Sequence, residues 1–497
     1  MKLCNIGHTF DYEMEKLIRL FLPFEKIEVL NAEENDTNCA ICKVFEEGDD
    51  ITVYAKLSLE DEVAEFSAVV DKTIIDTRKE TQHELARQLF YCFEKIMGYR
   101  PDWGILTGVR PAKLYLRYCN EYGEEYAKNF FKSKFLVSDK KLELCKKTVK
   151  SEEDIISLSG DNSFSLYLSI PFCPTRCSYC SFVSHAIEKA KDIIPQYVDL
   201  LCQELEITAK IAKELDLRLE TVYMGGGTPT TLNAEQLNRV LTTVRENFDM
   251  SCVREFTVEA GRPDTIDADK LIAIKQNGVT RISINPQTMN DSVLECIGRK
   301  HSANDTVKAF ELAREIGFGN INMDLIAGLP TDTTESFKDT LSQILKLNPE
   351  SVTVHSLSMK RASTLNTTGQ HEEIKMGAVA AEMVDFAQNE LTANEILPYY
   401  MYRQSKTVGN LENVGYAKRG YEGLYNVYIM DETHTILACG ASAVTKLKDR
   451  ESKNIKRIFN FKYPYEYING FGELISRKTE IGEFYDKYFK RDKQESN

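Results

Sequence analysis

From residue 165 onward, short apolar runs alternate with longer segments whose apolar residues follow helical spacing. The predicted strands are Leu166–Ile170, Thr221–Met224, Phe256–Glu259, Arg281–Ile284, Asn320–Ile326 and Ser351–Ser356. The predicted helices include Ile194–Lys213, Asn233–Phe248, Asp267–Asn277, Val307–Ile316 and Thr334–Leu347. Strands that alternate with helices form a parallel sheet with helices outside it. Six such units over residues 163–364 predict an α/β fold with a curved, partial (β/α)6 barrel.

The first 150 residues follow another pattern, which predicts a separate N-terminal α+β domain. Helices are expected at Asp11–Leu22 and Thr77–Gly98, and strands at Cys39–Phe45, Ile51–Leu57 and Glu65–Val70. The polar stretch Lys147–Asn162 predicts a linker to the barrel.

The order changes again over residues 365–497. A long helix is expected at Glu373–Leu391, followed by the aromatic segment Pro398–Arg403. Two short strands are expected at Tyr425–Met430 and Thr435–Ala438. We expect this part to form an α+β cap that closes the open side of the barrel.

Composition narrows the function classes. The chain has 497 residues and a net charge of −14, which argues against a protein that binds nucleic acid broadly. No apolar run reaches the ~18–20 residues of a membrane span. The N-terminus lacks a secretory pattern, and the 13 cysteines are scattered and odd in number. These features predict a cytoplasmic protein without a disulfide framework.

The most informative motif is Cys173-Pro-Thr-Arg-Cys177-Ser-Tyr-Cys180, which places three thiols within eight residues. Thiolates are the ligands of iron–sulfur clusters, and three of them leave one iron of a four-iron cluster without a protein ligand. A zinc knuckle is the alternative. Zinc needs four ligands in a closed site, and His185 is the only nearby fourth candidate. The spacing therefore favours a 4Fe–4S cluster.

Further candidate residues fall at or near the ends of the predicted strands, where ligands bind in such sheets. Met224-Gly-Gly-Gly-Thr-Pro-Thr230 exposes backbone groups to a ligand, although alone it would indicate only a tight turn. Glu259 closes the third strand and would otherwise be a solvated carboxylate. Asp324 lies inside an apolar strand, which costs several kcal/mol unless the charge is paired.

Other residues leave more than one interpretation open. Lys360, Arg361 and Arg403 would form an anion-binding rim or an ordinary solvated basic surface. The pair Cys39 and Cys42 resembles a redox or metal pair. On a strand, however, its odd spacing sends the two side chains to opposite faces, so we interpret it as structural.

These motifs together resemble the radical S-adenosylmethionine (SAM) superfamily. The residues that carry the resemblance are the three cysteines, Gly225–Pro229, Glu259, Gln287, Arg299 and Asp324–Pro330. More narrowly, they resemble its oxygen-independent coproporphyrinogen III dehydrogenase family. Trp103–Pro111, Lys360–Ser363 and Asn413–Ala417 are similar to the Z-type subgroup (HemZ), which extends the resemblance over nearly the whole chain.

The resemblance implies a role for each matching position. Cys173, Cys177 and Cys180 would hold the 4Fe–4S cluster, and SAM would chelate the open iron. The SAM-contacting positions implied by the family are Tyr167, Tyr179, Gly226, Gly227, Thr228, Glu259, Gln287, Arg299, Asp324, Ser358 and Val444. Gln287, Arg299 and Asp324 match residues near a second SAM molecule.

The implied activity is the oxidative decarboxylation of coproporphyrinogen III propionates to vinyl groups, which gives protoporphyrinogen IX in haem biosynthesis. Its partners would be this tetrapyrrole and an electron donor such as flavodoxin or ferredoxin. Some family members carry a fourth cysteine where this chain has Phe182. That position is also like the related haem-chaperone branch, so haem delivery and a radical reaction on another tetrapyrrole such as haem are the alternatives.

Overall fold

The structure is a computed structural model of the chain. It describes residues 1–497 apart from 24, 35, 49, 75, 109, 183, 359–369, 405, 450, 453 and 496–497. The described chain forms two compact units. Unit 1 contains residues 1–149, 366–381 and 401–412, and unit 2 contains 150–365, 382–400 and 413–497. Segments of the predicted C-terminal part therefore belong to both units, and the three domain boundaries stay a prediction.

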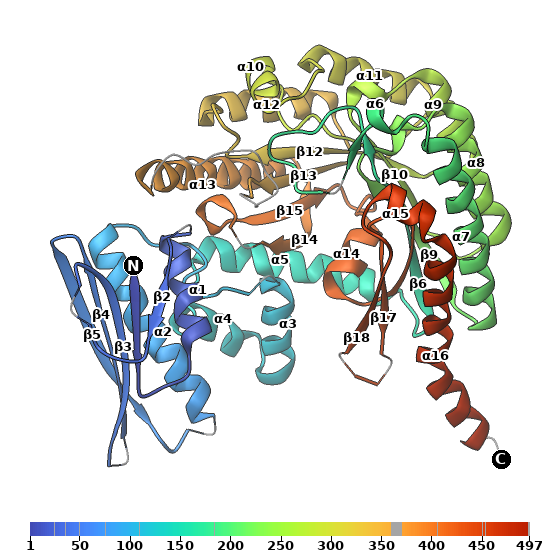
Figure 1. Ribbon diagram of the computed structural model, residues 1–497. Helices are drawn as coiled ribbons and strands as arrows, with labels where there is room; N and C mark the ends of the chain where they lie inside the picture. Colours follow the sequence, from blue (N-terminus) through green and yellow to red (C-terminus); the bar gives the residue numbers. More distant parts are fainter. Residues whose placement is uncertain are drawn as a thin grey trace. The chain divides into compact units, whose positions relative to one another are not determined.

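Unit 1 has a five-stranded sheet in the order β2-β1-β3-β4-β5. Its strands are β1 (Lys2–Ile6), β2 (Glu28–Leu30), β3 (Asn38–Glu47), β4 (Asp50–Leu59) and β5 (Glu62–Asp71). Helices α1 (Asp11–Phe21) and α2 (Thr77–Met97) lie along this sheet (Figure 1). The expected N-terminal α+β unit is confirmed, and each predicted strand and helix in it lies within two or three residues of its observed bounds.

Cys39 and Cys42 lie on opposite faces of β3, as their spacing predicts. The sulfur of Cys39 is 3.6 Å from that of Cys4, whereas Cys42 is buried near Cys92 of α2. Burial raises the pKa of the Cys39 thiol to about 12. Both cysteines are therefore protonated packing residues at neutral pH.

The predicted linker at Lys147–Asn162 contains the boundary between the two units, but the expectation of irregular structure there is wrong. Helices α3 (Pro111–Tyr122) and α4 (Glu124–Ser133) lead into α5 (Asp139–Ile156), which occupies most of that stretch. The buried residues Leu142, Cys145 and Val149 follow helical spacing along α5. Packing of this apolar stripe outweighs the polar composition of the segment.

Unit 2 is built on an eleven-stranded sheet in the order β14-β15-β13-β12-β11-β10-β9-β6-β16-β17-β18. Its six central strands are β6 (Ser163–Ile170), β9 (Arg218–Gly226), β10 (Glu255–Gly261), β11 (Arg281–Ile284), β12 (Ile321–Ala327) and β13 (Ser351–Ser356). They pair in parallel, each with the next along the chain. The predicted six-strand parallel sheet is confirmed.

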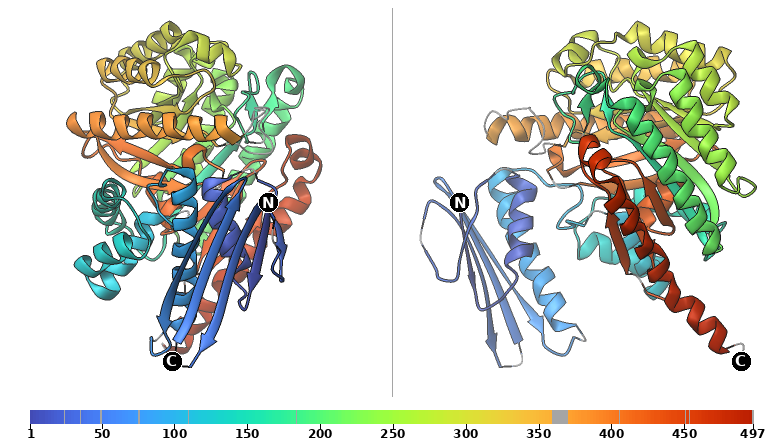
Figure 2. Two further views of the ribbon diagram at one scale, coloured as in Figure 1. Left: turned by 90° about the vertical axis from the view of Figure 1, so that its left-hand side faces the viewer. Right: turned by 45° about the vertical axis from the view of Figure 1, so that its right-hand side comes forward.

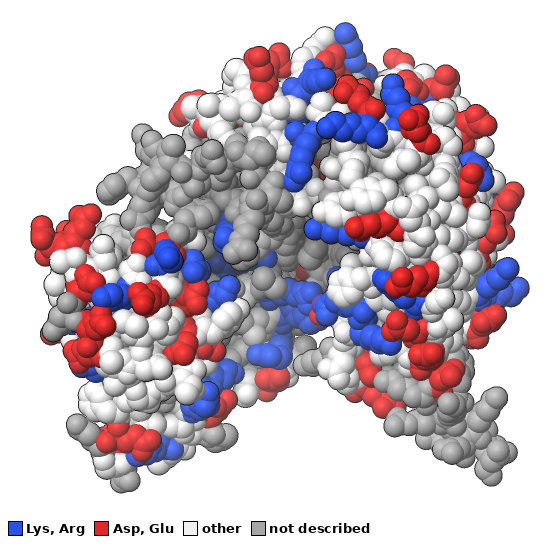
Figure 3. All heavy atoms as spheres, viewed as in Figure 1, with Lys and Arg blue, Asp and Glu red and all other residues white. Residues whose placement is uncertain are grey.

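Helices follow the first five central strands and cover the outer face of the sheet (Figure 2). These helices are α7 (Ile194–Glu214), α8 (Ala234–Asn247), α9 (Ala268–Gln276), α10 (Asp291–Cys296), α11 (Ala303–Glu315) and α12 (Thr334–Leu347). The helix after β13 is α13 (Gln370–Ala393), whose residues are divided between the two units. Acidic and basic side chains alternate over the outer helices at the right of Figure 3.

The C-terminal segment extends the sheet at both edges. At one edge, β15 (Glu412–Ala417) pairs antiparallel with β13, beside β14 (Leu397–Arg403). At the other, β16 (Thr435–Cys439) pairs in parallel with β6, and β17 (Val444–Lys448) and β18 (Ile455–Phe459) continue the sheet. Two further helices, α15 (Pro464–Asn469) and α16 (Phe471–Glu495), follow.

The strand predicted at Tyr425–Met430 is also wrong, because Leu424–Asp431 is the helix α14. The buried carboxylate of Glu255 on β10 accepts hydrogen bonds from the backbone N–H groups of Leu424 and Tyr425. A side chain about 170 residues away thus caps the start of α14. Within the described ranges, none of the helices combines the length and apolarity needed to span a membrane.

Candidate active site

The first cysteine of the motif is fixed by a short parallel pairing beside the barrel. Cys173 ends the two-residue strand β7 (Phe172–Cys173), which pairs with β8 (His185–Ala186). Its sulfur lies 3.4 Å from the hydroxyl of Thr228, and the Thr228 N–H donates to the Phe172 carbonyl at 2.8 Å. The cysteine loop is therefore tied to the glycine motif that follows β9.

The glycines of that motif stand where the backbone packs too closely for a side chain. A Cβ on Gly227 would lie 2.5 Å from the Phe172 carbonyl oxygen and 3.0 Å from the Cys173 sulfur. Gly226 has a φ of 109°, a conformation that L-residues rarely adopt. The backbone at Gly227 thus packs directly against Cys173, so a ligand at that sulfur would also lie beside the glycine backbone.

Burial raises the pKa of the thiols of Cys173 and Cys180. Such thiols stay protonated until a metal displaces the proton, so binding of a metal centre would release protons. Among the described residues, no three His, Cys, Asp or Glu side chains converge on the point that a single metal ion would occupy. A structural zinc ion takes four protein ligands, whereas this loop supplies three thiols.

His185 does not act as a fourth ligand in this geometry. Its ring packs edge-on against Tyr463 and Tyr465, with centroid distances of 5.7 and 5.8 Å. The zinc alternative therefore finds no support at this residue.

Five side chains on the barrel strands are more accessible to solvent than the residues on either side of them. Each is partly accessible to solvent on a strand whose flanking residues are buried. They are Tyr167 on β6, Tyr223 on β9, Glu259 on β10, Asp324 on β12 and His355 on β13. Because these strands are neighbours in the sheet, the five side chains together line one accessible polar region.

Glu259 occupies the centre of this polar region. The hydroxyl of Tyr223 donates to its carboxylate at 2.5 Å, and the rings of Tyr167 and Tyr223 are stacked with centroids 6.3 Å apart. Burial raises the pKa of Glu259 to about 7, while the bond from Tyr223 opposes that increase. The carboxylate is therefore balanced between a hydrogen-bond acceptor and a neutral acid near neutral pH.

Asp324 is paired, as its position inside an apolar strand requires. The amide of Asn322 donates to it at 2.7 Å, and a ring nitrogen of His355 lies 3.7 Å from its other oxygen. Burial alone would raise the pKa of Asp324, but His355 and Asn322 keep it below the usual value. Asp324 is thus an ionised acceptor at neutral pH.

Gln287 and Arg299 both follow β11 in the chain, and Arg299 contacts Tyr179 of the cysteine loop. The backbone of Gln287 bonds to Asp324 and Ile326, and its φ of 72° is unusual for a residue with a side chain. Its buried side-chain oxygen has no hydrogen-bond partner in the described chain. Arg299 donates to the hydroxyl of Tyr179 at 3.0 Å. The unsatisfied Gln287 oxygen is the kind of atom that a bound ligand would satisfy.

The remaining candidate residues to be placed include Ser358, Val444, Lys360 and Arg361. Ser358 follows β13, and Val444 begins β17 and pairs with Phe459, so their proposed contacts with SAM stay predictions. Lys360 and Arg361 lie outside the described residues.

Arg403 has a structural role in the geometry of unit 1. It is 6% exposed, and its guanidinium donates to the carbonyl of Leu106 and, at 3.0 Å, to that of Asn410. The guanidinium also lies over the Trp103 ring, 5.3 Å from the centroid. These contacts hold the Trp103–Pro111 motif, and they give no support to a substrate-binding rim at Arg403.

Sequence patterns did not indicate three residues that the structure places at the site. They are Tyr223, which bonds to Glu259, His355, which pairs with Asp324, and Arg262, which reaches the sulfur of Cys177 at 3.8 Å. Tyr223 could have been inferred from the sequence. Side chains alternate between the two faces of a strand, so Tyr223 lies on the same face of β9 as Gly225 of the glycine motif. Nothing local marks Arg262.

The comparisons with known proteins agree with this geometry. Residues 167–344 match the radical SAM superfamily. The oxygen-independent coproporphyrinogen-III oxidase-like protein HemZ of Bacillus subtilis (strain 168) is 34% identical over 495 residues, which cover 95% of this chain and 98% of that protein. The chain belongs to the HemZ-type radical SAM proteins.

Two other similarities cover less of the HemZ-type chain. The heme chaperone HemW of Bacillus subtilis (strain 168) is 34% identical over 281 residues, which cover 56% of this chain and 70% of that protein. The solved structure of coproporphyrinogen III oxidase (HemN) from Escherichia coli is 24% identical with a TM-score of 0.47, covering 65% of this chain and 72% of that one.

Membership of the radical SAM superfamily implies a 4Fe–4S cluster and SAM as cofactors. The residues present fit both groups. The cysteine loop supplies three thiols, and the strip at Gly225–Gly227 leaves backbone beside Cys173. Glu259 and the unsatisfied oxygen of Gln287 add acceptors along the same strand ends.

Proposed function

We propose that this protein is an oxygen-independent coproporphyrinogen III dehydrogenase. It would convert propionate side chains of coproporphyrinogen III to vinyl groups and so form protoporphyrinogen IX. For each vinyl group, one hydrogen atom leaves the β-carbon of the propionate, the carboxylate leaves as carbon dioxide, and one electron passes to an acceptor. The observation that carries the proposal is the 34% identity to HemZ over 95% of this chain.

In this proposal Cys173, Cys177 and Cys180 hold the cluster. When bound, the reduced cluster and SAM supply one-electron radical chemistry for hydrogen abstraction. The protein's own contribution is to position both groups. Ionised Glu259 would accept hydrogen bonds from the ribose hydroxyls of SAM, and the backbone at Gly225–Gly227 would take its amino-acid end.

Gln287, Arg299 and Asp324 would form a second polar region for SAM or substrate. Arg299 is buried and keeps its charge, while Asp324 is ionised and paired with His355. A zwitterionic ligand would pair with both a buried cation and a carboxylate, and a carboxylate-bearing ligand would pair with the cation. The stoichiometry of SAM binding to the protein would show whether one or two SAM molecules bind.

Haem delivery is the second candidate, and two observations favour it. HemW, named a heme chaperone, is 34% identical over 281 residues of this chain. Phe182 follows the cysteine motif and is 67% exposed, where some dehydrogenases have a cysteine. An exposed aromatic ring beside the cluster loop would suit contact with a flat tetrapyrrole.

The deciding experiment is turnover by the anaerobically reconstituted full chain. The protein is incubated with a reductant, SAM and coproporphyrinogen III, and the products are identified by mass spectrometry. The proposal predicts vinyl products together with 5′-deoxyadenosine, and a Cys180→Ala variant should form neither. Added flavodoxin or ferredoxin, each in reduced form, tests the proposed electron donor in the same assay.

Three other outcomes have distinct meanings. Formation of 5′-deoxyadenosine without a vinyl product would contradict the substrate assignment but leave the radical chemistry intact. Stoichiometric haem binding without SAM cleavage would support delivery. Modified haem in the presence of SAM would indicate a radical reaction on another tetrapyrrole.

A further inference from the structure

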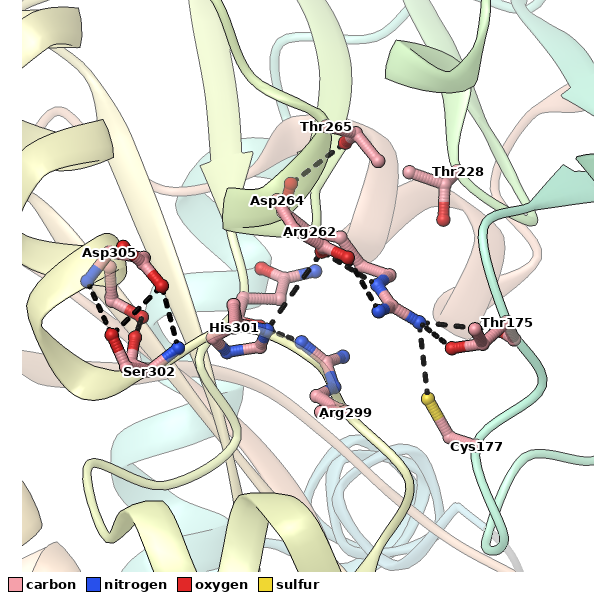
Figure 4. A network of polar contacts seen from close by, with 12 residues as sticks. Thr175, Cys177, Thr228, Arg262, Asp264, Thr265, Arg299, His301, Ser302 and Asp305 are labelled. Carbon is pink, nitrogen blue, oxygen red and sulfur yellow. Dashed lines mark hydrogen bonds and ion pairs between the residues drawn. The ribbon is translucent and has the colours of Figure 1, made fainter.

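Arg262 lies beside the cysteine loop although it comes from another part of the sheet. It follows β10, whose register shifts between Glu259 and Gly261, and it is 3% exposed. Such a bulge bends a strand and redirects the residues after it. Figure 4 shows the guanidinium of Arg262 between Asp264 on one side and Thr175 and Cys177 on the other.

Every part of this guanidinium has a partner. Its Nε and Nη2 donate to the two carboxylate oxygens of Asp264 at 2.9 and 2.8 Å. Its Nη1 donates to the hydroxyl of Thr175 at 2.8 Å and to the Thr175 carbonyl at 3.3 Å. The same nitrogen lies 3.8 Å from the sulfur of Cys177. This forked, two-bond ion pair with Asp264 therefore fixes the direction in which the remaining nitrogen, Nη1, points.

The surrounding charges leave the positive end of this pair facing the sulfur. Asp264 lies on the far side of Arg262, and a nitrogen of His301 is 3.9 Å from one Asp264 oxygen. Burial lowers the pKa of His301 to about 4, so its ring adds no charge at neutral pH. Arg299 is another buried cation near this loop, and its donors are directed to Tyr179 and the Asn285 carbonyl.

We propose that Arg262 is a positioning residue that raises the reduction potential of the 4Fe–4S cluster. A cluster that gains an electron becomes more negative, and a hydrogen bond or cation at a ligand sulfur favours that reduced form. The fork to Asp264 orients the guanidinium, and the bonds to Thr175 keep the loop within its reach. The inference needs the cluster that the superfamily implies, and it is independent of the substrate.

The test is an EPR-monitored redox titration of the anaerobically reconstituted full chain without substrate. Arg262→Gln should give a midpoint potential more negative by ~59 mV, which corresponds to a tenfold change in a one-electron equilibrium. Arg262→Lys keeps the charge but loses the fork, and its potential should fall between the two. Iron and sulfide contents are measured for each variant.

Two control variants separate charge from loop structure. Thr175→Val removes one of the two bonds to Thr175 but keeps the cation and its bond to the Thr175 carbonyl, so the loop stays within reach and the potential should change little. Arg245→Gln removes one positive charge at an exposed position of α8, where the side chain donates to the Gln276 carbonyl, and should leave the potential unchanged.

The proposal is overturned if Arg262→Gln keeps a full cluster at the wild-type potential, or if Thr175→Val shifts the potential as far as Arg262→Gln does. If Arg262→Gln holds no cluster, Arg262→Lys decides. A lower potential in Arg262→Lys with an unchanged one in Thr175→Val supports the proposal, whereas the wild-type potential in Arg262→Lys overturns it.

Discussion

At the residue scale, the protonation of Glu259 follows from two opposing effects. Burial favours the neutral acid, and the hydroxyl of Tyr223 favours the carboxylate by donating to it. The resulting pKa of about 7 lies close to working pH. A ligand whose hydroxyl groups need an ionised acceptor would therefore bind less well as pH falls through 7.

Removing the hydroxyl of Tyr223 should shift this pH dependence upward. A hydrogen bond to a charged group contributes about 1.5 kcal/mol, so Tyr223→Phe should raise the pKa of Glu259 by about one unit. The affinity for SAM should then fall about fivefold at pH 7 and hardly change at pH 9. Equilibrium dialysis of SAM against the reconstituted protein between pH 6 and 9 measures the effect.

Tyr425→Phe is the matched control. It removes a hydroxyl from a ring stacked 4.6 Å from that of Tyr223, and no hydrogen bond joins Tyr425 to Glu259 in the described part of the chain. Its pH profile should match that of the wild type. An unchanged profile in Tyr223→Phe would show that Glu259 does not control SAM binding.

A site residue can be predicted from the sequence when its neighbours in the chain reveal its environment. Asp324 stands out because a carboxylate inside an apolar strand needs a partner, and His355 with Asn322 supplies it. Arg262 does not stand out, because its partner Cys177 is 85 residues away and a bulge sets its direction. Long-range geometry of this kind leaves no periodic pattern in the sequence.

At the element scale, the barrel strands were predictable because they are buried on both faces and have continuous apolar runs. The helix α14 was not. Its sequence, Leu424-Tyr-Asn-Val-Tyr-Ile-Met-Asp431, is rich in aromatic and β-branched residues that favour strands. The carboxylate of Glu255 overrides this preference by accepting from the first N–H groups of the helix.

Loss of that carboxylate should loosen the start of α14. A helix N-cap contributes about 1 kcal/mol, so Glu255→Ala should increase hydrogen exchange in peptides covering 424–431 by about fivefold. Mass spectrometry of exchanged peptides measures this. Glu235→Ala changes an exposed residue in the first turn of α8, whose cap is Asn233, and should leave exchange in both helices near the wild-type rate. Equal exchange of 424–431 in Glu255→Ala and wild type would refute the capping role.

At the scale of the whole molecule, C-terminal segments complete the sheet of unit 2 rather than forming a separate layer over it. The strand β16 pairs directly with β6, the strand that leads to the cysteine motif. The turn after β16 is held by Glu204 of α7, which accepts from the Gly440 N–H at 2.7 Å and from the Tyr467 hydroxyl at 2.7 Å. The sequence pattern predicts the strand β16 but not its position at this edge of the sheet. Pairing between residues so distant along the chain has no local signature.

The ion pair between Lys478 and Glu204 joins α16 to this arrangement. The two side chains are 3% and 0% exposed and lie 2.9 Å apart. Breaking a buried pair leaves an uncompensated charge, so Lys478→Met should destabilise unit 2 by about 3–5 kcal/mol. Thermal unfolding should show a lower midpoint for the transition of that unit. Glu473→Ala removes an exposed pair on the same helix and should cost less than ~0.5 kcal/mol.

A double variant separates the unpaired charge from the lost packing. Glu204→Gln keeps an oxygen that can accept from Gly440 and Tyr467 but carries no charge. Combined with Lys478→Met, it should recover part of the lost stability, because no ion then remains buried alone. If the double variant is as unstable as the sum of the two single changes, the charge pairing contributes nothing of its own. The attachment of α16 would then depend on packing around Lys478 alone.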